Sequence, residues 1–468
     1  MSSAALPVES AGHDRVRDAL ASRIARAVVR VTSDELGTQV TEKIKTCLFD
    51  FIGCAFESRN LPWSMQAKHL LQPVTDGACV IGASETASYA DAAFVNAVMG
   101  HGLVREDMHS GSVSHLGIVV LPTLLALSQH RPVSGREFIV SAAVGYEVGA
   151  RVGRAAMSPE IACIHRPTGI SGPIGSAAAG ARLLGLDASA TTSAIALATN
   201  TTLGFNQWAH TGGSEMFFQA GYAARNALTA VQLAKAGAFA SPTALDGEAG
   251  LFASLGKRAA SSQVTVFDSE PEILSVFHKP VPACNFAQTT CQAALAIARE
   301  KKWAPDQIKS IQVRVPRAGM LYPGCDSTGP FEHVLQAKMS IQYNVAAALI
   351  NASVSEDNFS LLADPQLHRL ISMISMNVDD EMTRAYPDKQ GGEVEVFERD
   401  GGHHRVRLDD VVVASPAEVR ERFRRETAKA IGDRCAQEIE ALIDDIEDCS
   451  DAGRLAAALG TVPNNDGD

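Results

Sequence analysis

The sequence predicts a mainly α-helical protein with a smaller α+β domain. Apolar residues recur at helical spacing up to about residue 260, whereas the alternation typical of strands is confined to the stretch after about residue 265. A chain of 468 residues is also long enough for two domains. We therefore expect a large helical-bundle domain made of residues 1–265 and of C-terminal helices at 413–468, with an α+β domain inserted at 266–412.

The first helix is predicted over residues 14–31, where apolar side chains recur every four positions at Val16, Leu20, Ile24 and Val28. Thr32 and Glu35 form a capping box ahead of the next helix. Ser134 with Glu137 opens another, and the segment GSAAAGARLLGL ends at Gly185, a typical residue after a helix. Alanine and glycine recur in these segments, which favours closely packed helices in a compact bundle.

The strand signals come later in the chain. The segment IKSIQVRVP alternates apolar residues, and GEVEVFERDGGHHRVRLDDV alternates around Asp400 and Gly401, which predicts a hairpin. Ser415 with Glu418 then starts a further helix, and residues 436–459 are predicted to be helical. The last residues, 462–468, have the composition of a disordered tail.

Composition narrows the class of protein. Apolar residues make up 46% and charged residues 20%, as in soluble enzymes, and the net charge of −12 disfavours nucleic acid or an anionic membrane as a partner. The nine cysteines are scattered and never form CxxC, which indicates reduced thiols. The first residues, MSSAALPVESAGHDRVRD, lack the apolar core of a signal peptide, so we expect a cytoplasmic location.

Six charged or imidazole side chains lie close together between two apolar segments: His101, Arg105, Glu106, Asp107, His109 and His115. Placing such groups beside segments that would otherwise bury cleanly costs folding energy, which proteins tolerate mainly at functional sites. The spacing fits neither HExxH nor a structural zinc pattern, so we expect no metal. The glycines of TGISGPIG and the serine of TGGSE fit neither a dinucleotide motif nor a nucleophile elbow.

Four segments resemble the MmgE/PrpD family and occur in the order of its motifs: NAVMGHGLVREDMHSGSVSHLGIVVLPTLLAL, HRPTGISGPIGSAAAGARLLGL, FHKPVPACNFAQ and QAKMSIQYNVAAALI. Members include 2-methylcitrate dehydratase, cis-aconitate decarboxylase and iminodisuccinate epimerase, which act on small polycarboxylates without metal or organic cofactor. The resemblance implies a helical domain built from both ends of the chain, an inserted α+β domain, a cleft at their junction and a homodimer.

The chain departs from the family pattern at several positions. Met216 and Gln219 stand where the family has lysine and histidine, and the histidine of H-x-T-G falls on Arg166. In the lyases the first two positions are thought to help bind carboxylates or move protons, so their loss weakens a dehydratase or decarboxylase assignment. Cys284 replaces a histidine found in some decarboxylases.

We therefore predict an epimerase that needs no cofactor and acts on a small polycarboxylate such as iminodisuccinate. Tyr322 or Lys279 would serve one face of the α-carbon, and His115, aided by Asp107, the other. Arg105, Arg166 and Lys279 in the cleft would stabilise the negative charge of the intermediate. The predicted substrate-binding residues are Arg105, His109, Arg166, Thr168 and Gln219.

Two alternatives remain open at this point. One is a lyase of the same family that dehydrates or decarboxylates a tricarboxylate, and the other is a polycarboxylate-binding protein without catalysis. For single residues, the alternative is an ordinary structural role: Arg105 and Arg166 as surface ion pairs with Glu106 and Glu160, Tyr146 in the core, and His101 packed within its helix.

Overall fold

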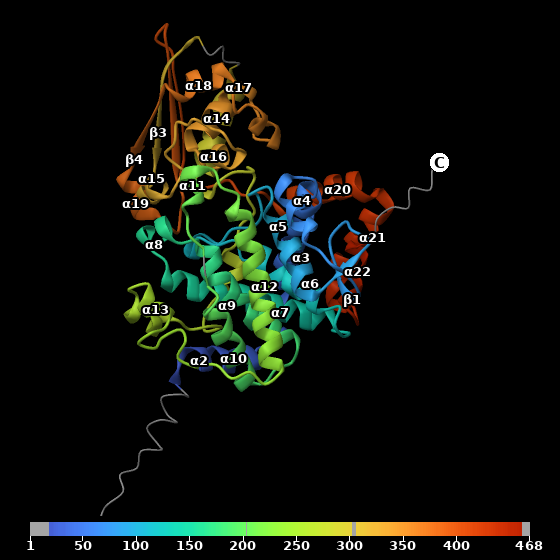
Figure 1. Cartoon of the computed structure of the whole chain (residues 1–468). Coiled ribbons are helices and arrows are strands. Elements are labelled where there is room, and N and C mark those ends of the chain that lie inside the picture. The colour runs from blue at the N-terminus through green and yellow to red at the C-terminus, as the bar shows by residue number, and fades with distance from the viewer. Residues whose placement is uncertain (1–17, 203, 302–305, 461–468) are drawn as a thin grey trace, which may run out of the picture.

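The computed structural model of the chain describes residues 18–202, 204–301 and 306–460. It is mainly helical with a smaller α+β part, which confirms the predicted fold class. The helical body occupies one end of the molecule and the α+β part the other (Figure 1). The first helices of the body are α2 (Leu20–Arg30), α3 (Ser33–Ser58), α4 (Pro62–His69), α5 (Tyr89–His101), α6 (Gly117–Leu127) and α7 (Gly135–Ala156). They are followed by α8 (Pro159–Ile164), α9 (Pro167–Leu183), α10 (Ala188–Thr199), α11 (Trp208–Thr211), α12 (Glu215–Lys235) and α13 (Leu251–Ser254).

The helix ends follow the predicted signals. Thr32 caps α3, since its amide donates to the Glu35 carboxylate at 2.8 Å, and Ser134 caps α7 by accepting from the Glu137 amide. Gly185, just beyond α9, has the left-handed φ of 67°. Val16 and residues 462–468 lie outside the described residues. A short antiparallel pair that the sequence did not indicate, β1 (Pro73–Cys79) and β2 (Thr86–Ala87), precedes α5.

The α+β part is built on a four-stranded sheet of order β4-β3-β5-β6. Its strands are β3 (Ile308–Val315), β4 (Ile374–Val378), β5 (Gly392–Glu398) and β6 (His403–Leu408). The predicted hairpin is confirmed, since β5 and β6 pair antiparallel, whereas β3 and β4 pair parallel. The helices of this part are α14 (Gln288–Glu300), α15 (Arg317–Leu321), α16 (Val334–Met339), α17 (Ile341–Asn351), α18 (Pro365–Ile371) and α19 (Asp380–Ala385). Helix α14 packs between the sheet and α17.

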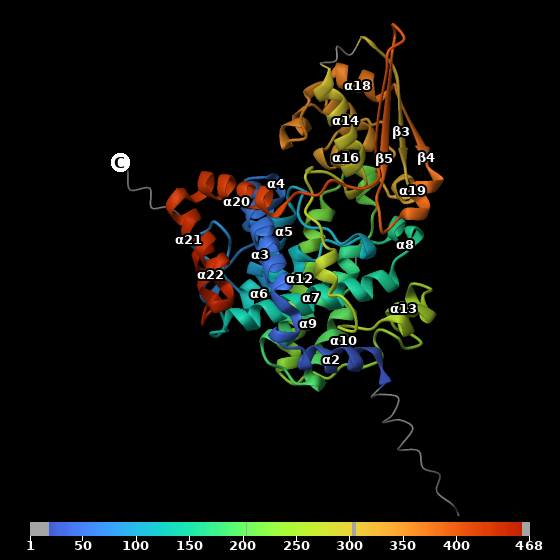
Figure 2. The ribbon, with the colours of Figure 1, turned by 180° about the vertical axis from the view of Figure 1, so that it is seen from behind.

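The C-terminal helices return to the first part of the chain. Helix α20 (Pro416–Ile431) begins at the predicted cap Ser415 and lies beside α3 in both views (Figures 1 and 2). Their backbones are so close that a Cβ added at Gly53 would lie 3.2 Å from Phe423 Cα. The stretch 436–459 is not one helix, because α21 (Asp433–Asp444) ends before the short turn η6 (Ile446–Asp448) and α22 (Gly453–Leu459) begins anew.

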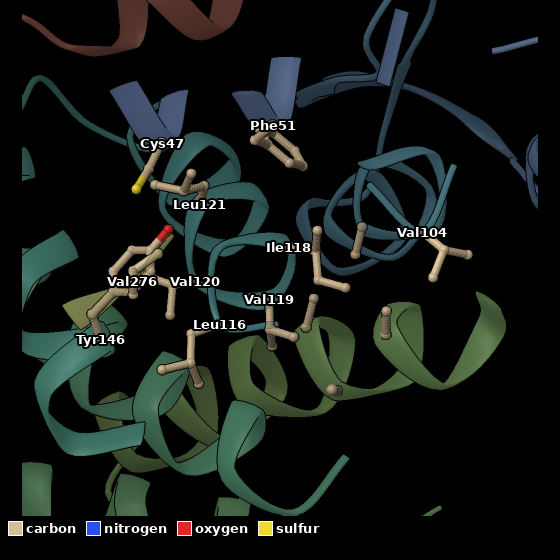
Figure 3. Close-up of a cluster of buried hydrophobic side chains, with 14 of the residues drawn as sticks. Cys47, Phe51, Val104, Leu116, Ile118, Val119, Val120, Leu121, Tyr146 and Val276 are labelled. Carbon is tan, nitrogen blue, oxygen red and sulfur yellow. The ribbon is translucent and has the colours of Figure 1, made fainter. Parts of the chain in front are cut away.

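Apolar packing in the helical body sets the position of the α5–α6 loop. Leu116, Ile118 and Val119 at the start of α6 lie in a cluster with Phe51 of α3 and Tyr146 of α7 (Figure 3). His115 immediately precedes this cluster, so its backbone is fixed by a close-packed core. Among the described helices, none has both the length and the apolar composition needed to cross a membrane.

Helices α7 and α9 approach closely through glycine. A Cβ at Gly175 would lie 2.4 Å from the Gly145 carbonyl oxygen. Gly175→Ala should therefore lower the free energy of unfolding by about 1–3 kcal/mol, because neither backbone can move aside without disturbing the core. Urea denaturation would measure the loss. Gly319→Ala is the matched control, because its Cβ would meet its nearest neighbour at 3.5 Å; equal stability of the two variants would contradict the close-approach argument.

Candidate active site

Two buried lysines hold the loop that joins α5 to α6. Lys279 donates to the carbonyl oxygens of Val104 and Ala283, and Lys338 of α16 donates to that of Leu103 at 3.0 Å. Lys338 also pairs with Glu356 at 2.6 Å. Val104 has a φ of 59°, which is costly for a β-branched residue and persists only where the surroundings impose it. The lysines thus fix the turn that carries the charged cluster.

The carboxylate of Glu106 lies at the centre of that cluster and is almost completely buried. Its Oε1 is 2.5 Å from His101 Nδ1 and 3.0 Å from His115 Nδ1. Burial would raise the pKa of Glu106, but His101 and Lys279 outweigh that effect and the pKa lies below its ordinary value. The site therefore contains a buried negative charge between two imidazoles.

The hydrogen bonds of His115 assign its two ring nitrogens different roles. Nδ1 lies 2.9 Å from the carbonyl oxygen of Asp107, which can only accept, so Nδ1 carries the hydrogen and Nε2 keeps its lone pair. Burial, together with Lys279, His101 and Arg166, holds the pKa of His115 well below its ordinary value. At neutral pH His115 is therefore a neutral imidazole that can accept a proton at Nε2.

Arg166, just before α9, links this cluster to the α+β part. Its guanidinium donates to His101 Nε2 at 3.0 Å and to the Tyr322 hydroxyl at 3.2 Å. Since arginine only donates, His101 is neutral and donates through Nδ1 to Glu106. Burial raises the pKa of Tyr322 above its ordinary value despite the nearby Arg166, so this phenol keeps its proton at neutral pH.

His115, Arg166 and Tyr322 meet at an inner cavity of about 20 Å³. The cavity lies between the α5–α6 loop and the segments that follow Lys279 and α15. Its polar lining consists of His115, Arg166, Cys284, Asn285 and Tyr322. Its apolar lining consists of Val104, Met108, Val113, Met216, Phe286 and Met339. A space of this size holds about one water molecule. A polycarboxylate can enter only if the lining parts.

A larger outer pocket of about 320 Å³ adjoins the inner cavity. The two share Val113, Phe286 and Tyr322, so these side chains form the wall between them. Arg154 and Arg317 line the outer pocket. Its volume suits a small ligand. Glu160 also lines it, and the Arg154 guanidinium is paired with Glu272 at 2.6 Å, so Arg317 is the guanidinium left to attract an anion. The outer pocket therefore adjoins the cavity on the side of Phe286 and Tyr322.

The structure separates the predicted catalytic residues. His115 and Tyr322 line the inner cavity. Lys279 lies behind the lining, fully buried, with its ammonium on two carbonyls. The Asp107 carboxylate accepts from the Tyr146 hydroxyl at 2.5 Å and from the Gly117 amide at 3.2 Å, away from the cavity. Asp107 acts on His115 through its backbone carbonyl alone.

Of the predicted substrate-binding residues, Arg166 lines the inner cavity. Arg105 is buried and pairs with Glu57, and Thr168 accepts from the His115 amide at 3.1 Å. Arg105 and Arg166 are both buried, so the alternative that they are surface ions is wrong. His109 donates to Glu272 at 2.8 Å, and Gln219 donates to the Phe205 carbonyl at 3.1 Å, so both lie outside the cavity lining.

The residues predicted for specific roles left out four polar residues of this site, His101, Glu106, Cys284 and Asn285, although the first two were noted as members of the charged cluster. His101 and Glu106 belong to the hydrogen-bonded network, although His101 was expected only to pack within its helix. Cys284 lines the cavity, and its sulfur lies 3.5 Å from that of Cys325. Its place in the KPVPAC segment, five residues after Lys279, was the signal available.

Tyr146 is buried in the core, as predicted. Among the described residues, no group of three or more His, Cys, Asp or Glu is arranged to hold a metal ion.

Comparison with known proteins identifies the family. The MmgE/PrpD N-terminal domain matches residues 22–263, and the MmgE/PrpD C-terminal domain matches residues 281–448. The chain belongs to the MmgE/PrpD family.

Three curated relatives of this MmgE/PrpD protein show how far the similarity extends. A cis-aconitate decarboxylase-like protein of Aspergillus oryzae is 26% identical over 92% of this chain and 95% of its own length. The cis-aconitate decarboxylase of Mus musculus is 27% identical over 78% of each chain. The mitochondrial 2-methylcitrate dehydratase of Yarrowia lipolytica is 30% identical over 31% of this chain and 29% of its own length.

Acid titration should reveal the contribution of the buried Glu272 carboxylate, which contacts His109, Arg151 and Arg154. Burial would raise the pKa of Glu272, but His109, Arg154 and Arg151 lower it to about 2, compared with 4.5 for an ordinary glutamate. Its contribution to stability is therefore complete above pH 4.5 and is lost as the pH falls through 2. Urea denaturation should show that wild type loses more stability than Glu272→Gln across this window. Glu85→Gln, which removes an exposed carboxylate, is the control, and parallel curves for wild type and Glu272→Gln would contradict the assignment.

Proposed function

We propose that this chain is a lyase that acts on a small tricarboxylate, with the decarboxylation of cis-aconitate as the first candidate reaction. The observation that carries the proposal is the lining of the inner cavity, which combines the guanidinium of Arg166 and the proton-carrying groups of His115 and Tyr322 with apolar side chains. The family relatives with cis-aconitate decarboxylase in their names, which match most of the chain, support the same class.

Arg166 is the group best placed to bind a substrate carboxylate. Of the cations in the described part of the chain, it is the one that lines the inner cavity. Planar guanidinium groups bind carboxylates through two parallel hydrogen bonds. His101 and Tyr322 hold Arg166 in place before substrate arrives, which reduces the cost of ordering it on binding.

The apolar part of the cavity lining favours the loss of carbon dioxide. Met108, Met216 and Met339 offer no hydrogen-bond donor to a second carboxylate placed against them. A carboxylate deprived of water is destabilised relative to a transition state in which its charge spreads into the carbon framework.

Tyr322 can supply the proton that decarboxylation requires. When the bond to the leaving carboxylate breaks, its electron pair moves into the carbon skeleton, and the phenol proton transfers to carbon. Arg166, which donates to the same hydroxyl, stabilises the phenolate until solvent returns a proton. His115 Nε2 can take a proton from carbon, which a dehydration would need and a simple decarboxylation would not.

Epimerisation is the second candidate, and the absence of the family's lysine and histidine at Met216 and Gln219 favours it. His115 and Tyr322 would then exchange a proton on two faces of one carbon. Iminodisuccinate carries four carboxylates, however, and one guanidinium in the cavity lining compensates only part of that charge. For this reason the tricarboxylate lyase stands first.

A substrate panel tests the proposed reaction. The purified chain should release carbon dioxide from cis-aconitate in D2O and leave deuterium at the carbon that receives the proton, as read by proton NMR. The panel also holds citrate, 2-methylcitrate and iminodisuccinate, so that dehydration and silent α-deuteration are seen in the same assay. Deuteration of iminodisuccinate without any elimination would overturn the lyase proposal in favour of the epimerase. Ligand-induced stabilisation with no exchange on any compound would indicate a binding protein.

Removal of one hydroxyl tests the role of Tyr322. Tyr322→Phe should lower kcat by about 10²–10⁴-fold, because proton transfer by a positioned acid contributes that much. The ring and its contact with Phe286 remain in this variant, so the melting temperature should change little. Tyr222→Phe, on the exposed face of α12, is the control and should keep wild-type kcat. Unchanged kcat in Tyr322→Phe would exclude it as the acid.

A further inference from the structure

Two cysteines meet beside the inner cavity in a way that the proposed reaction does not explain. The sulfurs of Cys284 and Cys325 are 3.5 Å apart, and both residues are buried. Cys284 lines the cavity itself. Among the described cysteines, this is the pair whose thiols contact one another.

The surroundings favour the thiolate form of Cys284. Burial would raise its pKa, but hydrogen bonds from the Cys325 thiol and the Phe286 amide, together with the charges of Lys279 and Arg166, lower the pKa below its ordinary value. Burial and the neighbouring Cys284 raise the pKa of Cys325 well above its ordinary value. One thiol of the pair is thus activated and the other keeps its proton, which is the arrangement of an attacking and a resolving cysteine.

The pair also lies close in sequence to Phe286 and Tyr322, the two aromatic residues of the wall between the inner cavity and the outer pocket. Phe286 follows Cys284 by two residues, and Tyr322 precedes Cys325 by three, with the Cys325 amide donating to the Tyr322 carbonyl at 3.1 Å. The two aromatic rings contact one another with centroids 5.3 Å apart. A covalent bond between the sulfurs would therefore tie together the two segments that must separate when substrate enters.

We propose that Cys284 and Cys325 form a peroxide-sensitive thiol pair whose disulfide locks the Phe286–Tyr322 wall and closes the site. A sulfur–sulfur bond of about 2.05 Å requires the two atoms to move about 1.5 Å closer than they are now. The inner cavity holds about one water molecule, so a small uncharged oxidant such as hydrogen peroxide reaches Cys284 more readily than a large disulfide does.

The chemistry proceeds in two balanced steps. The Cys284 thiolate attacks one oxygen of hydrogen peroxide, the O–O bond breaks, and the leaving hydroxide takes up a proton to give water and a sulfenic acid. The Cys325 sulfur then attacks the sulfenic sulfur, the S–O bond breaks, and the leaving hydroxide takes the Cys325 proton. Two thiols and one peroxide thus give one disulfide and two waters, and a dithiol reductant reverses the change.

Peptide mass mapping of the intact wild-type chain tests the bond without any assay of activity. After limited hydrogen peroxide, a crosslinked peptide that contains Cys284 and Cys325 should appear, lighter by two hydrogens than the sum of its reduced halves, and dithiothreitol should remove it. Cys291, buried on α14 with a pKa raised to about 12, should stay reduced. Failure to find the Cys284–Cys325 peptide while other cysteines oxidise would overturn the proposal.

Activity measurements test the closing of the wall, and this arm alone rests on the proposed lyase function. Oxidised wild type should lose activity about a hundredfold, since a displacement of about 1 Å near reacting groups has that effect, and dithiothreitol should restore it. Cys325→Ser should be inactivated without recovery, because its sulfenic acid lacks a resolving thiol and oxidises further. Cys291→Ser should behave as wild type.

The outcomes separate the two proposals. A crosslinked peptide in a chain that acts on no compound of the substrate panel would leave the thiol pair standing and remove the lyase. A crosslinked chain with full activity would overturn the closing of the wall. Equal peroxide inactivation of wild type and Cys284→Ser would show that another residue is the target; circular dichroism of each variant confirms that it has folded.

Discussion

The site depends on the burial of opposite charges in the turn after α5. Glu106 is a carboxylate in the protein interior, and such a group is stable only with compensating partners. His101 and His115 contact its Oε1, while the ammonium of Lys279 lowers its pKa through space and holds the Val104 carbonyl. Because Lys279 comes from beyond residue 265, this one arrangement also joins the α+β part to the helical body.

The same arrangement accounts for the small volume of the inner cavity. Lys279 and Lys338 draw the segments of the α+β part onto the Leu103 and Val104 carbonyls, so the apolar side chains between them close on one another. Phe286 and Tyr322 are the part of this lining that also faces the outer pocket. When this lining closes over a bound substrate, it excludes water and so strengthens every electrostatic interaction within the site.

Local sequence signals were sufficient for the fold class. The capping residues Thr32, Ser134 and Ser415 and the hairpin around Gly401 depend only on neighbours in the chain, and each is confirmed. The site could be predicted only in part. Motif positions indicated His115 and Tyr322, but the direction in which Lys279 and Arg105 point is decided by partners far away in sequence, Val104 and Glu57. No spacing rule reveals such long-range pairing.

The same limit explains why the sequence favoured an epimerase. That prediction assumed a cleft lined by three cations, and the structure places two of them, Arg105 and Lys279, in structural contacts. With Arg166 as the cation of the cavity lining, the site compensates one carboxylate well and presents an apolar surface to another. Loss of carbon dioxide removes such a poorly solvated charge, whereas epimerisation returns it unchanged to the same surroundings. The uneven distribution of charge, rather than the number of proton carriers, is therefore what distinguishes the two reactions in this cavity.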